Sequence, residues 1–168
     1  LTPDHTAIIE SASVIGLAML EPSQRAPLEN DSTGLGQIIL HATANGAKRL
    51  VIGIGGSATN DGGFGMARAL GWEFLDSANK PITQWAALGQ LRSIKQPLNF
   101  SLPPVTVAVD VQNPLLGPEG CTRVYGPQKG FNETDISPAE DALKTLARTW
   151  ENQMGEAADQ LPGAGAAG

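Results

Sequence analysis

Side chains that could bind a small ligand are concentrated in one glycine-rich stretch. Ser57, Thr59, Asn60 and Asp61 offer hydroxyl, amide and carboxylate groups within five residues. Glycines flank them on both sides, at positions Gly53, Gly55, Gly56, Gly62, Gly63 and Gly65. Because glycine has no Cβ, its backbone can turn sharply or lie very close to another group. We therefore predict a binding loop, with phosphate or carboxylate as the ligand chemistry.

The segment before these glycines determines where the loop must lie. Residues 49–54 are mostly apolar and rich in β-branched side chains, which is typical of a strand buried on both faces of a parallel sheet. Residues 63–70 then follow a helical pattern. Open α/β sheets bind ligands at the carboxyl ends of their strands. The sequence therefore predicts a central strand with the glycine-rich loop at its carboxyl end.

Two known nucleotide-binding motifs are similar in part to this loop. A Walker A loop requires a lysine and then a serine or threonine after its last glycine, whereas Gly63 is followed by Phe64. A dinucleotide fingerprint of the form G-x-G-x-x-A does fit Gly53, Gly55 and Ala58, and Asp76 follows at about the spacing of a ribose-binding acid. A Rossmann-type dinucleotide-binding domain therefore remains an alternative.

The residues alone also leave the role of the loop open. One interpretation is an anion site, where backbone N–H groups and a helix dipole favour phosphate or carboxylate. The other is a tight turn in which Asp61 only caps the helix that follows. Asp110, directly after the apolar residues 105–109, has a similar ambiguity between ligand binding and turn formation. Lys129 is either a point charge for phosphate or a solvated side chain on a turn.

The rest of the pattern predicts an α/β fold, with a parallel or mixed sheet and helices packed on it. Strands are expected at residues 6–10, 49–54, 72–75 and 105–109, the last of them buried. Helices are expected at residues 11–20, 63–70 and 85–94, and in two further segments, one capped by Thr33 and the other by Ser137. The second of these has an apolar face of Leu143, Leu146, Ala147, Trp150 and Met154. Residues 113–130, with three prolines and four glycines, are expected to form a loop.

Composition limits the classes of protein that fit. The 168 residues are 41% hydrophobic, which suffices for one globular core. A formal net charge of −6 argues against a general nucleic-acid or anionic membrane surface, since both would need a basic patch. The single Cys121 excludes an internal disulfide, and no apolar run reaches bilayer length. We therefore expect a cytoplasmic protein that binds small molecules, with a homo-oligomer as one option.

Four stretches in order resemble the bacterial glycerate kinase family. They are GIGGSATNDGG with GMARALG at residues 53–71, NPLLGPEG at residues 113–120, YGPQKG at residues 125–130 and PGAGAAG at residues 162–168. The likeness extends over nearly the whole chain. The sequence is similar to the type of glycerate kinase that forms 2-phosphoglycerate.

The resemblance implies an ATP-dependent transfer of a phosphoryl group to D-glycerate, with Mg²⁺ as a cofactor. Phosphoryl transfer depends on positioning and on charge neutralisation. On that basis phosphate or glycerate contact is expected at Gly55, Gly56, Ser57 and Thr59, with Asn60 supporting the loop. Asp61 and Asp110 are the candidates for metal binding or hydroxyl activation, and Lys129 is the candidate for charge neutralisation.

The ends of the chain indicate a piece of something longer. Leu1 is not an initiating methionine, and residues 156–168 end within a glycine- and alanine-rich tail. We therefore expect residues 1–168 to be one α/β domain, or a partial two-domain fragment of a larger kinase, that contains part of the active site. A folded fragment without catalytic activity is a further alternative.

Overall fold

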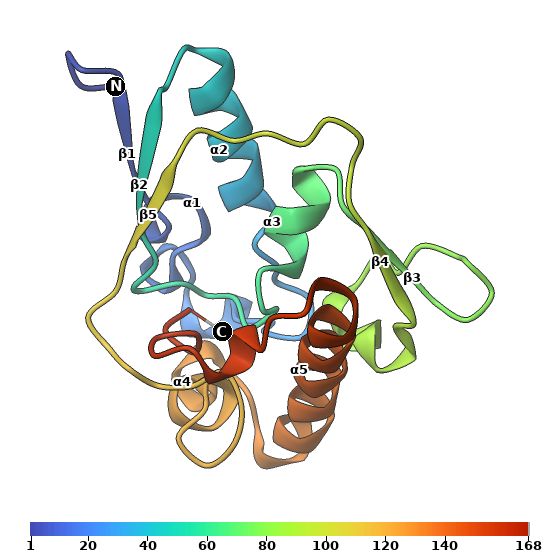
Figure 1. Cartoon of the computed structure of the whole chain (residues 1–168). Helices are drawn as coiled ribbons and strands as arrows, with labels where there is room; N and C mark the ends of the chain where they lie inside the picture. Colours follow the sequence, from blue (N-terminus) through green and yellow to red (C-terminus); the bar gives the residue numbers. More distant parts are fainter. Residues whose placement is uncertain (168) are drawn as a thin grey trace.

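The computed structural model describes residues 1–167, in which a parallel sheet of three strands forms one side of the molecule (Figure 1). Its order is β1 (Thr6–Glu10), β2 (Arg49–Gly53) and β5 (Val105–Ala108). The predicted α/β class and the central position of β2 are confirmed. Gly168, at the end of the expected glycine- and alanine-rich tail, lies outside the described residues.

Helix α2 (Thr33–Ala44) connects β1 to β2 and forms the first hydrophobic core with them. Leu35 and Ile39 of the helix pack with Leu50 and Ile52 of β2 in that core. Helix α3 (Phe64–Ala69) lies beside α2 (Figure 1). The two helices approach so closely that a Cβ at Gly36 would lie 2.6 Å from the Cβ of Ala69. This packing fixes the start of α3 relative to the sheet.

The expected burial of the sheet on both faces is wrong. In β2, Leu50 and Ile52 are buried but Val51 is only half-buried, so one face is covered. Val105 and Val107 of β5 pair with Leu50 and Ile52 and share their face, because neighbours in a parallel sheet point the same way. Both valines are nevertheless exposed. The physical reason is that the described helices cover β1 and β2 and stop short of β5.

A second hydrophobic core forms around α5 (Glu133–Met154), on the other side of α3. The helix packs against the antiparallel pair β3 (Glu73–Leu75) and β4 (Ser93–Lys95) and the 3-10 helix η3 (Trp85–Gln90). The predicted apolar face of α5 is confirmed, since all five of its members are buried in this core or packed against it. Only part of the expected helix at residues 85–94 forms, because its last residues pair as β4.

Helix α5 begins earlier than the sequence pattern indicated. Its cap is Asn132, whose Oδ1 accepts a hydrogen bond from the backbone N–H of Thr134 over 3.0 Å. The backbone N–H of Asn132 donates in turn to Oδ2 of Asp135 over 3.2 Å, so the expected Ser137 cap is wrong. Pro138 lies inside the helix, where its missing N–H removes one backbone hydrogen bond. Packing of the apolar face of α5 in the second core holds the helix despite that loss.

The expected loop at residues 113–130 is also wrong in part, because α4 (Cys121–Lys129) occupies its second half. The helix includes Pro127, and Gly126 lets it pack closely on Phe131, to which an added Cβ would come within 3.2 Å. Burial of Cys121 and Thr122 stabilises a helix that local propensity disfavours. Lys129 therefore lies on a packed helix and not on a solvated turn.

The remaining described elements are short. The expected helix at residues 11–20 is divided into α1 (Ala12–Ile15) and η1 (Leu17–Met19) by Gly16, whose backbone is extended. Two further 3-10 turns are η2 (Pro22–Gln24) and η4 (Ala158–Gln160). None of the helices within residues 1–167 is both long enough and apolar enough to cross a bilayer.

Candidate functional site

The glycine-rich loop leaves the carboxyl end of β2 as an exposed turn at Gly55 and Gly56. Two backbone hydrogen bonds then attach it to the α1–η1 segment. The N–H of Leu17 donates to the oxygen of Gly56 over 2.9 Å, and the N–H of Ala58 donates to the oxygen of Ile15 over 2.7 Å. The loop is therefore an ordered part of the fold, with its first turn facing outward.

The glycines of the loop serve two different purposes. Gly62 has a φ of +59°, and Gly65 lies where an added Cβ would be 2.6 Å from the backbone nitrogen of Thr33. These two are needed for internal packing. Gly55 has no positive φ, and an added Cβ would meet nothing within 4 Å. Nothing in the described chain requires glycine at position 55, so the open space beside it is available to a ligand.

Asp61 is completely buried and organises the loop from within. Its Oδ2 accepts hydrogen bonds from the backbone N–H and hydroxyl of Ser32, over 2.9 and 2.8 Å, and from the N–H of Gly65 over 2.7 Å. Its Oδ1 accepts from the N–H of Gly63 over 3.3 Å. Burial raises the pKa of the Asp61 carboxyl, and the hydrogen bonds from Ser32 and Gly65 partly offset this effect.

These contacts fit the capping interpretation of Asp61 and correct the expected cap of α2. Thr33 was the predicted cap, but Ser32 holds the cap position and its hydroxyl bonds to Asp61 instead of to its own helix. The same hydroxyl accepts a hydrogen bond from the N–H of Met66 over 2.9 Å. Ser32 and Asp61 thus join the starts of α2 and α3.

Lys129 enters the loop from α4 and is almost fully buried. Its ammonium group donates to the backbone oxygens of Thr59 and Ala167, and lies 3.5 Å from the hydroxyl of Ser57. Ser57 itself donates to the oxygen of Ala167 over 3.0 Å. Burial lowers the pKa of Lys129 to about 8, against the opposing effects of Cys121 and Asp61. The fold therefore brings Lys129, Ser57 and Thr59 together.

Asn60 makes a separate contact with α4. Its Nδ2 donates to the hydroxyl of Thr122 over 2.9 Å, and both side chains are fully buried. Within residues 1–167, the buried Oδ1 of Asn60 has no hydrogen-bond partner. Asn60 thus connects the loop to the helix that presents Lys129.

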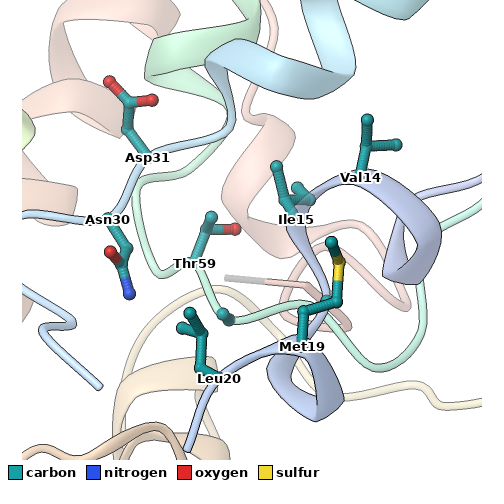
Figure 2. A pocket seen from close by; sticks show the side chains of 9 residues that line it. Val14, Ile15, Met19, Leu20, Asn30, Asp31 and Thr59 are labelled. Carbon is teal, nitrogen blue, oxygen red and sulfur yellow. The ribbon is translucent and has the colours of Figure 1, made fainter. Parts of the chain in front are cut away.

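A cavity of about 210 Å³ lies beside the loop, between the α1–η1 segment and the residues before α2 (Figure 2). Val14, Ile15, Met19 and Leu20 form its apolar lining, together with the backbone at Gly16 and Ala58. Its polar lining comes from Asn30, Asp31 and Thr59. Among the predicted site residues, Thr59 alone lines this cavity. Asn30 and Asp31 were missed because they fall in a segment of loop composition, far from the glycines in sequence.

The two predicted metal-binding aspartates do not form a cluster. Asp110 is exposed just beyond β5, and within the described residues it has no hydrogen bond to the loop. Residues 1–167 contain no group of three or more His, Cys, Asp or Glu residues that could hold a metal ion. Mg²⁺, however, commonly needs only one or two carboxylates and takes its remaining ligands from phosphate and water. Asp31 and Asp110 fit that requirement better than Asp61, whose oxygens already accept hydrogen bonds.

The dinucleotide alternative is not supported by the position of Asp76. Its Oδ1 accepts hydrogen bonds from the N–H groups of Ala78 and Lys80, in the turn after β3. That strand belongs to the two-stranded sheet on the opposite side of α3 from β2 (Figure 1). Helix α3 also begins at Phe64, well after the fingerprint glycines. A ribose-binding acid would have to lie beside the end of β2.

Comparisons with known proteins agree with this architecture. The model of the glycerate kinase family matches residues 1–168. The "Glycerate kinase" of Bacillus subtilis is 44% identical over 98% of this chain, and the "Glycerate 2-kinase" of Escherichia coli is 40% identical over 97%. A crystal structure assigned to glycerate kinase 2 from Salmonella typhimurium LT2 superposes with a TM-score of 0.90 at 40% identity and covers 100% of this chain.

The match extends over less than half of these longer proteins. The chain spans 44% of the length of both curated relatives and 46% of the crystallised chain. Within that part, the sequence and the three-dimensional fold agree from end to end. The chain therefore belongs to the glycerate kinase family.

Proposed function

We propose that this chain supplies the phosphate-binding part of a kinase that transfers the γ-phosphoryl group of ATP to D-glycerate and forms 2-phosphoglycerate. The observation that carries the proposal is the turn at Gly55 and Gly56. It lies at the carboxyl end of the central strand, is exposed, and has open space where a side chain at position 55 would be. A phosphate group can approach such a backbone closely and accept hydrogen bonds from its N–H groups.

In this proposal the other predicted site residues support the turn. Thr59 offers its hydroxyl at the adjoining cavity. Lys129 places a positive charge beneath the loop, where it favours a bound anion without touching it. Ser57 and Asn60 hold the loop to that lysine and to α4. Asp61 acts mainly by positioning, because its oxygens are occupied by backbone N–H groups and Ser32.

The transfer itself requires a base and charge neutralisation. The hydroxyl oxygen of D-glycerate forms a bond to the γ-phosphorus, the bond to the β–γ bridging oxygen breaks, and ADP leaves. We assign the acceptance of the hydroxyl proton to the exposed carboxylate of Asp110. Mg²⁺, when bound, would neutralise charge on the phosphates, and Asp31 is the carboxylate beside the loop that fits it.

Calorimetric titrations test the proposal on this chain and on a polypeptide of full family length that contains it. ATP with Mg²⁺ should bind to both, and NAD to neither. D-Glycerate phosphorylation should be measured with the full-length polypeptide. Saturable binding of NAD that is lost in Asp76→Ala, with no binding of ATP, would favour the dinucleotide alternative and overturn the proposal.

A further inference from the structure

The lining of the cavity between η1 and the residues before α2 suits ATP and D-glycerate, the two substrates of the proposed reaction, to different degrees. We infer that it binds the nucleoside part of ATP, an inference that rests on the proposed function. Figure 2 shows Val14, Ile15 and Met19 on one side of the cavity, Asn30 and Asp31 on the other, and Thr59 between them. One side is thus apolar and the other polar.

The apolar side suits a flat aromatic base. Met19 and Val14 are exposed by 60% and 36%, so their apolar surface is open to a ligand. Methionine is flexible and polarisable, and it packs well against aromatic rings. D-Glycerate consists of a carboxylate and two hydroxyl groups on three carbons, and it has almost no apolar surface to bury. The aliphatic lining therefore favours the base over the acid.

The polar side carries groups that match a nucleoside. Asn30 lines the cavity, and within residues 1–167 its buried Nδ2 has no hydrogen-bond partner. An asparagine amide can pair with adenine through one donor and one acceptor. Asp31 uses its Oδ1 to accept from the N–H of Thr33 over 2.9 Å, and its Oδ2 is the oxygen proposed above for Mg²⁺. The same negative charge disfavours the carboxylate of D-glycerate.

The size of the cavity and its position beside the loop agree with a nucleoside as the bound group. Pockets for whole drug-sized ligands usually measure about 300–1,000 Å³. At about 210 Å³ the cavity holds only a part of ATP. Ala58 and Thr59 line it and lie two and three positions beyond Gly56 in the loop. A nucleoside bound here would therefore direct its phosphates toward the Gly55–Gly56 turn.

Methyl and amide NMR spectra of this chain test the inference with three probes. Adenosine should shift the methyl signals of Ile15 and Met19 and leave that of Leu40, on the exposed side of α2, unchanged. D-Glycerate should shift neither cavity signal. Tripolyphosphate should shift the amide signals of Gly55 and Gly56. If tripolyphosphate acts but adenosine does not, the inference is overturned and the phosphate turn stands. If neither acts, both proposals fail.

A matched pair of variants provides the second test, by calorimetry with ATP and Mg²⁺. Met19→Glu places a carboxylate on the apolar side of the cavity at an exposed position, so the fold should be retained. It should weaken ATP binding at least about tenfold, equivalent to about 1.4 kcal/mol. Leu40→Glu, also at an exposed position, should change the affinity less than about twofold. Equal ATP affinity in both variants, or a loss of D-glycerate affinity alone in Met19→Glu, would exclude the nucleoside as the occupant.

Discussion

Lys129 and Thr59 are joined by a hydrogen bond from a buried ammonium group to a backbone carbonyl oxygen, across 70 positions of the sequence. The same nitrogen bonds to the oxygen of Ala167. One cation thus holds the glycine-rich loop, helix α4 and the last described residues together.

Replacing the lysine should loosen the loop locally. Lys129→Met fills a similar volume but leaves the oxygens of Thr59 and Ala167 without their donor. Loss of a bond worth about 1.4 kcal/mol corresponds to about tenfold faster opening. We expect the amide of Ala58, which bonds to Ile15, to exchange about tenfold faster by hydrogen-exchange NMR. The amide of Leu50 in β2 serves as the control and should be unchanged. Equal exchange at Ala58 in both proteins would show that Lys129 does not hold the loop.

Titration of Lys129 should make stability depend on pH in the alkaline range. Its pKa is lowered to about 8 in the folded chain, whereas an unfolded lysine titrates near about 10.4. Between these values the unfolded chain binds more protons, so the free energy of unfolding rises with pH. The rise approaches at most about 3 kcal/mol if the full difference is realised. Urea denaturation at pH 7.5 and 10 measures it, after subtraction of the Lys129→Met values. If the corrected free energy of unfolding is the same at pH 7.5 and pH 10, the pKa of Lys129 is not lowered in the folded chain.

Asp61→Asn should destabilise the fold. The amide group would present a donor or a weaker acceptor to the N–H groups of Ser32 and Gly65, which now bond to a single carboxylate oxygen. We expect a loss of about 2–4 kcal/mol in the free energy of unfolding. Asp110→Asn, at an exposed position, should change it by less than about 0.5 kcal/mol. Urea denaturation of the two variants makes the comparison. A stable Asp61→Asn protein with impaired turnover would instead support Asp61 as a catalytic or metal-binding group.

Substitution by alanine should have different effects at Gly65, which the fold requires, and at Gly55, which it does not. At Gly65 the added methyl would lie 2.6 Å from the backbone of Thr33, so Gly65→Ala should cost at least about 1–3 kcal/mol. At Gly55 the methyl meets nothing within 4 Å, so Gly55→Ala should leave the melting temperature unchanged. Differential scanning calorimetry checks both. Destabilisation by Gly55→Ala would mean that this glycine serves the fold and not a ligand.

Sequence patterns predicted the helices and strands whose residues have strong local preferences. Strand β2 is a nearly continuous apolar run, helix α2 has apolar residues at helical spacing, and the glycine-rich loop between β2 and α3 was expected where it lies. Helix α4 was missed because Pro127 and Gly126 disfavour a helix, and tertiary packing on Phe131 and burial of Cys121 compensate. The exposure of β5 depends on which strands the helices cover, and no residue in that strand encodes this.

The candidate site was predictable only along the glycine-rich loop. Ser57, Thr59 and Lys129 were expected to share a site, and the fold brings them together. Asn30 and Asp31 come from a segment before α2 that reaches the loop only in three dimensions. A local sequence pattern does not show which distant segments come into contact in the folded chain.

In this proposal the exposed Gly55 turn binds the phosphates of ATP, and the γ-phosphoryl group is transferred to D-glycerate. The most direct measurement is ³¹P NMR of the reaction of ATP, Mg²⁺ and D-glycerate with a polypeptide of full family length, with and without Gly55→Ala. We predict formation of 2-phosphoglycerate by the unchanged protein and at least about tenfold slower formation by the variant at equal melting temperature. Absence of phosphorylated glycerate with the unchanged protein, or an undiminished rate with Gly55→Ala, would contradict the account.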